Sequence, residues 1–560
     1  MELTKTEPAP VAPVASRRSR VSWWAVLSGT IALLIVGPLL ALPLSFVGGA
    51  DGFFDPLART LLPDALRTSI LLALGVAVGT LLLGGGLAAL VSFYDFPGRR
   101  VLDWALVLPM AMPGYVLVFV VLGQYGLASP LQSNLFGNGL QIPGLRTPFA
   151  AICILTAVLY PYVYVLGRSA FLGQSRQAFD AARVLGRTHG QAVLRVALPL
   201  ARPALAAGVA LAVMEALADF GTVNLLGVQA LTNAIFRAWN GAFDEDAALQ
   251  LATVLLTLTL TLLTVERAMR GRARYEQNLA HGNIVEPRRL RGWRAALAAV
   301  PGWLLLLVAF FLPVAQLVAW SVETIADGST VSSLGTAARN TVVLAAVAAT
   351  VAVALATAMV YGQRAQPTRI GRILSRLTTV GYAIPGTVVA VAVYVPLIWI
   401  DRRVVDLSED FTGNTITLLF TGSMLGLVFA YVVRFNALAF LSVEARMARI
   451  PTNLDDAARS LGADRARVLA DVHVPLLRPG VLAAALLVLV EVIKELPATA
   501  LLRPLGYDTL AITVWEATKD SRLDAAALPA LLIVLVGLLP VIVLVRLLRS
   551  EGWTSAAQQI

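Results

Sequence analysis

The sequence predicts an all-α membrane protein of about twelve transmembrane helices, arranged as two parallel repeats of six helices each. Composition is the first reason. Hydrophobic residues make up 58% of the 560 residues and charged residues only 14%, against about 25% charged residues in soluble domains. The mean hydropathy is +0.76, which excludes a soluble or disordered chain. The second reason is that apolar runs of spanning length recur throughout, and the second half repeats motifs of the first.

Each predicted span is an apolar run of roughly 20 residues or more, the length that crosses the hydrocarbon core. The first run follows a Pro/Ala-rich and then basic segment, 1–21, and is longer than the core of a signal peptide. We expect an uncleaved anchor, with a cleaved signal as the alternative. The predicted spans are 22–47, 66–94, 101–123, 148–170, 203–227, 246–266, 295–320, 338–362, 377–400, 415–440, 479–503 and 525–547.

Loop charges predict the topology, because arginine and lysine accumulate on the cytoplasmic side of a membrane. The loops after the second, fourth and sixth spans are rich in arginine, as in 176–202 and 267–294, whereas the alternate loops are richer in acid, as in 244–246. Both termini are therefore expected in the cytoplasm. This orientation explains most of the net charge of +10, so the basic composition does not indicate a nucleic-acid partner.

The two halves repeat each other at matched positions. Pro113 matches Pro385, 272 residues later, and Glu215 matches Glu491, 276 residues later. Six spans per half is an even number, so both halves enter the membrane from the same side, whereas inverted repeats need an odd number. Two parallel halves predict a central path on a pseudo-two-fold axis. The expected segments are a cytoplasmic tail 1–21, a first unit 22–266, a cytoplasmic linker 267–294 acting as a tether, a second unit 295–548 and a cytoplasmic tail 549–560.

The sequence offers little chemistry for catalysis. Cys153 is the single cysteine and the three histidines are scattered, so neither a disulfide within the chain nor a Cys/His metal cluster is expected. The phosphate-binding pattern G-x-x-x-x-G-K-S/T does not occur. We therefore expect no enzyme activity, no bound cofactor, no stably coordinated metal and no ATP hydrolysis by this chain.

The loop after the fourth span carries the strongest motif, and it occurs in both halves. The copies read DAARVLGRTHGQAVLRVALP and DAARSLGADRARVLADVHVP. This pattern predicts a short helix, a tight turn at a glycine and a second short helix ended by proline. Small alanines would let another protein approach closely, whereas a single copy would also suit an amphipathic helix lying on lipid headgroups. The motif residues are Asp180, Ala181, Ala182, Gly186, Pro199, Asp456, Ala457, Ala458, Gly462 and Pro475.

These two loops resemble the EAA loop of permeases of binding-protein-dependent ABC importers. Asp180 and Asp456 stand where the family has Glu, and Val196 and Val472 stand where it has Ile. The resemblance covers nearly the whole chain as two fused permease units. It implies the type I importer permease fold, a bacterial inner-membrane location, a periplasmic substrate-binding protein, and two ATPase subunits that use ATP and Mg²⁺ and dock on the two loops.

A narrower resemblance points to the fused permeases of iron(III) uptake systems. It rests on MEALADFGTVNLLG, on VEVIKELPATALLRPLGYDTLA and on the last apolar run, AALPALLIVLVGLLPVIVL. Fused permeases for thiamine and aminoethylphosphonate are the nearest alternatives. A parallel-repeat secondary transporter and a channel are the competing classes, and the paired docking loops argue against both.

Five ionisable residues lie inside the predicted fifth spans. A charge at the centre of a bilayer costs about 2.5–3.5 kcal/mol on insertion scales, so these side chains should face protein or water. Pairs spaced by four lie on one helix face, and both halves show this spacing. The pattern predicts a translocation path, with a buried network that only holds helices together as the alternative. The residues are Glu215, Asp219, Glu491, Lys494 and Glu495.

Proline and glycine interrupt both predicted third spans, at Pro113 and Gly114 and again at Pro385 and Gly386. Proline removes a backbone hydrogen bond and bends a spanning helix. A gating role and a tolerated kink are equally compatible with this pattern.

Overall fold

The computed structural model describes residues 23–46, 55–125, 144–174, 176–270, 287–328, 334–366, 368–413, 416–464 and 467–557. Over these residues, ten helices are long and apolar enough to cross a membrane, and two further pairs of helices meet at a sharp bend. Counting each bent pair as one span gives twelve, which confirms the predicted all-α membrane class. Helices dominate because a helix satisfies its own backbone hydrogen bonds, as lipid requires.

The first half contains six spans, with short non-α helical turns (η) inside or between them. Its elements are α1 (Trp23–Val36), η1 (Gly37–Leu40), α2 (Ala41–Leu44), α3 (Pro56–Thr80), η2 (Leu81–Gly85), α4 (Gly86–Phe93), β1 (Tyr94–Asp95), α5 (Arg99–Ala105), η3 (Leu108–Ala111), α6 (Gly114–Tyr125), α7 (Pro148–Leu172), α8 (Arg176–Val184), α9 (His189–Ala192), η6 (Val193–Ala197), α10 (Leu198–Ala218), α11 (Gly221–Leu225), α12 (Leu231–Phe236), η7 (Arg237–Gly241) and α13 (Glu245–Arg270).

The second half repeats this order. Its elements are β2 (Arg288–Arg289), α14 (Trp293–Leu306), η8 (Leu307–Phe311), α15 (Leu312–Ala326), α16 (Leu334–Ala365), α17 (Arg369–Thr378), η9 (Thr379–Ala383), α18 (Gly386–Thr412), α19 (Met424–Met447), α20 (Thr452–Ser460), η10 (Val468–His473), α22 (Val474–Ile493), α23 (Pro497–Leu502), α24 (Leu510–Lys519) and α25 (Leu523–Ala557). The last helix therefore continues beyond the predicted end of the last span at 547.

Matched local structure accompanies the sequence repeat. The fourth spans, α7 and α19, both begin at a hydroxyl cap: Thr147 accepts a hydrogen bond from the Ala150 N–H, and Ser423 accepts one from the Gly426 N–H. Such caps satisfy backbone N–H groups that lack a partner inside the helix. The third span is bent in both halves, by 89° and 120°. Each half is thus built in the same way.

The first span of each half packs against the other half. α1 contacts α16 and α17, and α14 contacts α4 and α5. The Trp24 ring lies edge-on to Tyr361, with 5.1 Å between ring centroids. Gly362 makes room for it, because an added Cβ there would lie 3.2 Å from the Trp24 ring. The two halves therefore interlock through exchanged first spans.

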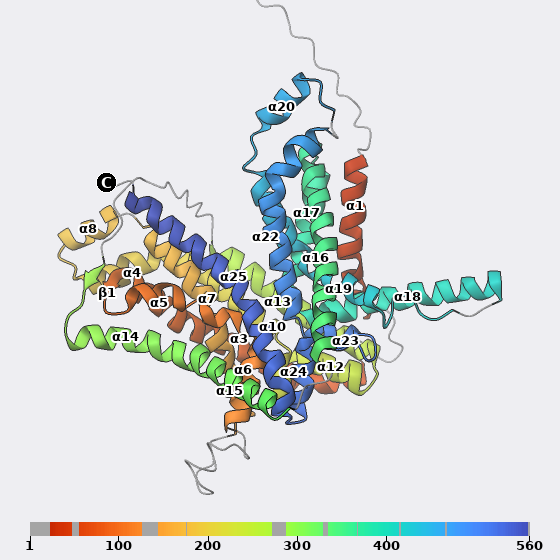
Figure 1. The fold of residues 1–560 in the computed structure, drawn as a ribbon, viewed down its shortest axis with the longest axis horizontal. Helices are drawn as coiled ribbons and strands as arrows, with labels where there is room; N and C mark the ends of the chain where they lie inside the picture. The colour runs from red at the N-terminus through yellow and green to blue at the C-terminus, as the bar shows by residue number, and fades with distance from the viewer. Residues whose placement is uncertain are drawn as a thin grey trace, which may run out of the picture.

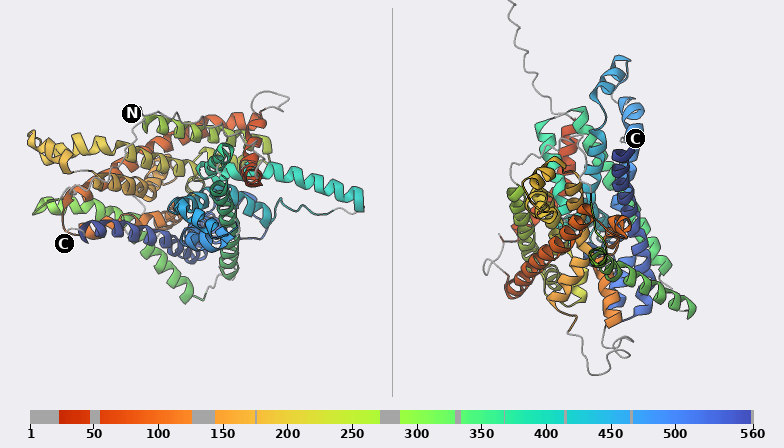
Figure 2. Two further views of the ribbon diagram at one scale, coloured as in Figure 1. Left: turned by 90° about the horizontal axis from the view of Figure 1, so that it is seen from above. Right: turned by 90° about the vertical axis from the view of Figure 1, so that its left-hand side faces the viewer.

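The helices of the two halves meet around α12, α23 and α24 and diverge from there (Figure 1). α8 and α20 lie at the far ends of two separate arms (Figure 1). In Figure 2 the view from above shows the yellow arm lengthwise and the blue arm nearly end-on, and the side view shows the blue arm lengthwise. Aromatic rings fill the meeting region: Phe220 and Phe236 of the first half pack on Trp515 of the second, each at 5.7 Å. The Trp515 indole N–H also donates to Asn224 (2.9 Å).

The end of the predicted linker is attached to the first half. β2 pairs in parallel with β1, aligning Arg288 with Tyr94 and Arg289 with Asp95, and the Leu290 N–H donates to the Asp95 carbonyl (2.8 Å). This part of the linker is more than the tether that the sequence suggested. The N-terminal tail 1–21 and linker residues 271–286 lie outside the described residues.

Candidate functional site

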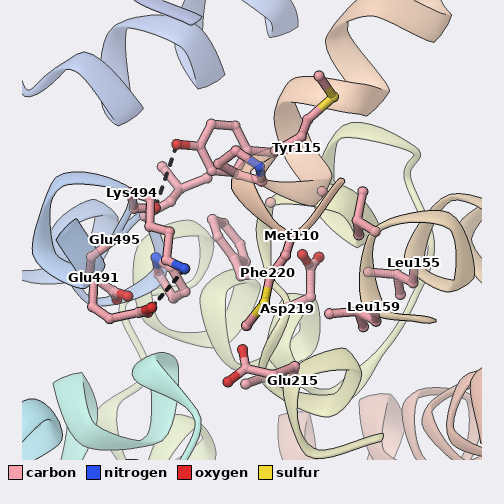
Figure 3. Close-up of a pocket in the computed structure, with 18 of the residues that line it drawn as sticks. Met110, Tyr115, Leu155, Leu159, Glu215, Asp219, Phe220, Glu491, Lys494 and Glu495 are labelled. Carbon is pink, nitrogen blue, oxygen red and sulfur yellow. Dashed lines mark hydrogen bonds and ion pairs between the residues drawn. The ribbon is translucent and has the colours of Figure 1, made fainter. Parts of the chain in front are cut away.

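A cavity opens where broken spans of the two halves meet. Figure 3 shows Glu491, Lys494 and Glu495 on one side of it, with Glu215 and Asp219 on another. All five residues of the predicted path therefore line one space, together with Arg434. Their part in transport stays a prediction.

Both fifth spans break within this cavity, which corrects the predicted continuous helices. α10 ends at Ala218, and Asp219 has an extended backbone, so Glu215 and Asp219 do not share one regular helix face. The Asp219 carboxylate instead accepts hydrogen bonds from the Thr222 N–H (2.8 Å) and hydroxyl (2.9 Å). In the other half the Glu495 carboxylate accepts one from the Ala498 N–H (2.9 Å). Each acid thus satisfies the first turn of the short helix that follows the break.

The second-half carboxylates are paired with cations. The Lys494 ammonium lies 2.7 Å from Glu491, and the Arg434 guanidinium lies 2.6 Å from Glu495. The lysine pair is a quarter exposed, whereas the Arg434 and Glu495 side chains are only 11% and 4% exposed. The sequence analysis did not identify Arg434. The only feature that could have indicated it is the presence of an arginine within the apolar run of α19.

The first-half carboxylates have no paired cation. Among the residues that the structure describes, neither Glu215 nor Asp219 forms an ion pair, although the charges of Arg434 and Lys494 act on Glu215 across the cavity. Within the same residues, no group of three or more His, Cys, Asp and Glu side chains could hold a metal ion.

The interrupted third span of the first half lines the cavity, and that of the second half packs against two residues that line it, Arg434 and Glu495. An added Cβ at Gly114 would overlap the Thr222 hydroxyl, and one at Gly386 would overlap the Arg434 guanidinium and lie 2.7 Å from Glu495. The glycines are therefore needed because the two breaks pack against the acids of the fifth spans. A gating role for Pro113, Gly114, Pro385 and Gly386 stays a prediction.

The two predicted docking loops share one turn geometry. α8 and α20 are short helices followed by Gly186 and Gly462, whose φ angles are +80° and +85°. Glycine adopts this left-handed conformation without strain. Leu185 and Leu461, just before these turns, are 81% and 89% exposed, which leaves apolar side chains available to a partner at both sites.

The closing prolines do not end the second helix, which corrects the motif prediction. Pro199 lies in the first turn of α10 and Pro475 in the first turn of α22. A π-helical turn, η6 or η10, precedes each proline. Because its hydrogen-bonding pattern differs from that of an α-helix, the helix continues although proline has no N–H group to donate. The loop therefore runs directly into the fifth span.

Aromatic packing anchors the loop of the first half. Phe179 of α8 stacks on Phe93 at 5.7 Å, and His189 lies edge-on to both Phe179 (5.0 Å) and Tyr94 (5.2 Å). Tyr94 belongs to β1, the strand that pairs with the linker strand β2, so this loop packs on the strand to which the linker is attached.

An ionic cluster anchors the loop of the second half. Asp455 of α20 lies 2.9 Å from Arg364 and 3.0 Å from His473. Burial alone would raise the pKa of the Asp455 carboxyl, but the hydrogen bonds and charges of Arg364 and His473 outweigh it and lower the pKa. The carboxylate therefore stays ionised at neutral pH.

The fold and the site define an α-helical membrane permease of two parallel halves. The family model described as "Binding-protein-dependent transport system inner membrane component" matches residues 81–265 and 351–550. The chain belongs to this family, with one match in each half. The resemblance to a fused importer permease is confirmed, and the protein is a multi-pass permease of an ABC importer.

Relatives differ in the substrates that their names state. The chain is 24% identical to the Fe(3+)-transport system permease protein FbpB 2 of Haemophilus influenzae, over 92% of this chain and 97% of that protein. It is 31% identical to a probable molybdenum ABC transporter permease of Haloferax volcanii, over 44% of this chain and 88% of that protein. It is 27% identical to the sulfate transport permease CysT of Salmonella typhimurium, over 42% of this chain and 86% of that protein.

Proposed function

We propose that this permease imports iron(III), which it receives from a periplasmic binding protein and moves to the cytoplasm by alternating access. Two ATPase subunits that dock on the α8 and α20 loops supply the energy from ATP and Mg²⁺. The chain itself binds no nucleotide and catalyses no reaction. In this proposal it lies in the bacterial inner membrane with both termini in the cytoplasm.

The acidic cavity is the observation that carries the proposal. Carboxylates from both halves line a space bounded by the broken third span of the first half and by both broken fifth spans, and iron(III) is a hard cation that prefers oxygen ligands. The relative named for Fe(3+) transport also aligns with both halves of this chain. Passage requires sites weak enough to release the ion, so the carboxylates guide the cation rather than chelate it.

An oxyanion is the second candidate substrate. Arg434 and Lys494 line the same cavity, and the buried Arg434 Nε has no hydrogen-bond partner among the described residues. Arginine and lysine bind oxyanions through charge-assisted hydrogen bonds. Relatives of single halves are named for molybdenum and sulfate transport.

Uptake into sealed vesicles separates these candidates. Vesicles containing the permease and its ATPase, supplied with the binding protein and ATP, should accumulate iron(III) and should not accumulate sulfate or molybdate. Uptake should persist with an uncoupler, unlike uptake by a proton-driven secondary transporter. Accumulation of an oxyanion without iron would overturn the iron assignment.

A further inference from the structure

The two cations of the cavity come from one half only. The repeat places Val158 at the position of Arg434 and Ala218 at the position of Lys494, each 276 residues earlier. Both apolar residues line the cavity as well. The four acids are thus matched between the halves, whereas the cations are not.

Each cation is engaged with a carboxylate of its own half. Lys494 lies one helical turn from Glu491 and 2.7 Å from its carboxylate. Arg434 reaches Glu495 at 2.6 Å by crossing the face of Gly386, where any side chain would block it. The wall contributed by the second half is therefore formally neutral.

The opposite wall keeps its negative charge. Asp219 is held by the Thr222 N–H and hydroxyl, and Glu215 forms no ion pair with any of the described residues. Neutral donors stabilise a carboxylate without cancelling its charge. The whole cavity thus carries an excess of two carboxylates, both from the first half.

We propose that Lys494 and Arg434 are specificity-determining residues that act as fixed counter-ions of the translocation path. They pair with Glu491 and Glu495 and also act on Glu215 across the cavity, so that a passing cation meets a net excess of two carboxylates rather than four. This inference rests on the proposed iron(III) function.

The physical reason is the balance between attraction and release. Four uncompensated carboxylates around one space would hold a trivalent cation too firmly to let it leave, and conduction requires weaker sites. One opposite charge within about 4–6 Å changes proton affinity by about ten- to a thousandfold. Fixed counter-ions therefore tune the affinity of the cavity for a cation.

Because the halves differ at this position, one substitution can introduce the lysine of the second half into the first half. Ala218→Lys places a lysine three residues after Glu215, as Lys494 stands three residues after Glu491. It should weaken binding of citrate-buffered iron(III) to the purified permease by about tenfold or more and slow ATP-driven uptake. Ala218→Met, of similar length without charge, is the matched control, because it separates the effect of the added charge from that of the larger side chain.

The reverse substitution tests the other direction. Lys494→Ala should tighten iron(III) binding by about tenfold or more while slowing uptake, because release becomes limiting. The double variant Ala218→Lys/Lys494→Ala moves the counter-ion to the other half and should restore binding and uptake toward the unaltered levels. Thermal unfolding of each variant identifies any that fail through misfolding.

The outcomes are distinct. If Ala218→Lys is stable and folded yet binds and transports iron as the Ala218→Met control does, the counter-ion role is wrong while the iron function stands. If Ala218→Lys speeds sulfate uptake and Lys494→Ala abolishes it, the cavity serves an anion, and both the counter-ion proposal and the iron function are overturned.

Discussion

Glu215 and Asp219 are the two carboxylates of the cavity that form no ion pair with the described residues, so substituting them tests the path most directly. Glu215→Gln combined with Asp219→Asn should lower iron(III) uptake by about tenfold or more, since one nearby charge is worth at least that factor. Stability should change little, because no ion pair is broken. Uptake in vesicles and a thermal-unfolding curve check this, and normal uptake by the double variant would rule out the path.

Gly386 tests how tightly the broken third span is packed. Gly386→Ala should displace the Arg434 guanidinium from Glu495 and destabilise the protein by about 1–3 kcal/mol, the usual cost of overpacking. Gly86→Ala is the matched control, because an added Cβ there meets no atom within 4 Å. Equal unfolding temperatures for the two variants would contradict the close packing at Gly386.

The residues of the cavity were only partly predictable. The Lys494–Glu491 pair follows from a spacing of three within one helix. The Arg434–Glu495 pair joins two spans across 61 residues, and no periodicity within a segment encodes that contact. Arg434 could have been noticed only as an unexplained charge in an apolar run. Such a charge indicates a side chain that faces protein or water rather than lipid, but it does not identify the partner.

At the scale of single elements, the docking loops depend on a backbone conformation. Gly186→Val and Gly462→Val each force a β-branched residue to a positive φ angle, at a cost of about 1–3 kcal/mol. Membrane insertion should be unchanged, whereas copurification with the ATPase should fall. If both variants still copurify with the ATPase and transport normally, the ATPase does not dock on these two loops.

The ionic anchor of α20 predicts that Asp455 itself stays ionised over the physiological range of pH. Because the pKa of Asp455 is lowered, its stabilising contribution is present above the unfolded-state value of about 3.9 and is lost only as pH falls through the folded-state value. Asp455 therefore gives ATPase binding no pH dependence from about pH 5 to 8, and any dependence in that range would come from its partner His473. Asp455→Asn should weaken ATPase binding across that range, and binding equal to that of the unaltered protein would exclude this anchor.

Sequence patterns located the spans well but not their interruptions. Apolar runs fix where a chain can lie in lipid, so the twelve spans could be predicted. The break in the fifth span depends on the Asp219 carboxylate, which bonds the following turn. Aspartate is a common residue at the start of a helix because it accepts hydrogen bonds from the first backbone N–H groups. Within an apolar run, however, Asp219 resembled a charge on a continuous helix.

At the scale of the whole molecule, the exchange of first spans decides which parts can move together. α1 belongs to the first half in sequence but packs on α16 and α17 of the second. The boundaries of the two units along the chain therefore differ from the boundaries of the packed bodies. Sequence repeats could not reveal this, because they match positions along the chain and carry no information about which helices pack together.

A disulfide between α1 and α16 tests whether these helices move as one body. An added Cβ at Gly362 would lie 3.6 Å from the Ser28 hydroxyl, within the reach of a disulfide. Cys153, the single native cysteine, is exposed and would first be replaced by serine. The Ser28→Cys/Gly362→Cys protein should form the bond under oxidation and retain ATP-driven uptake, because alternating access needs the packed bodies to move against each other rather than within themselves. Uptake lost on oxidation and regained on reduction would show instead that α1 separates from the second half during transport.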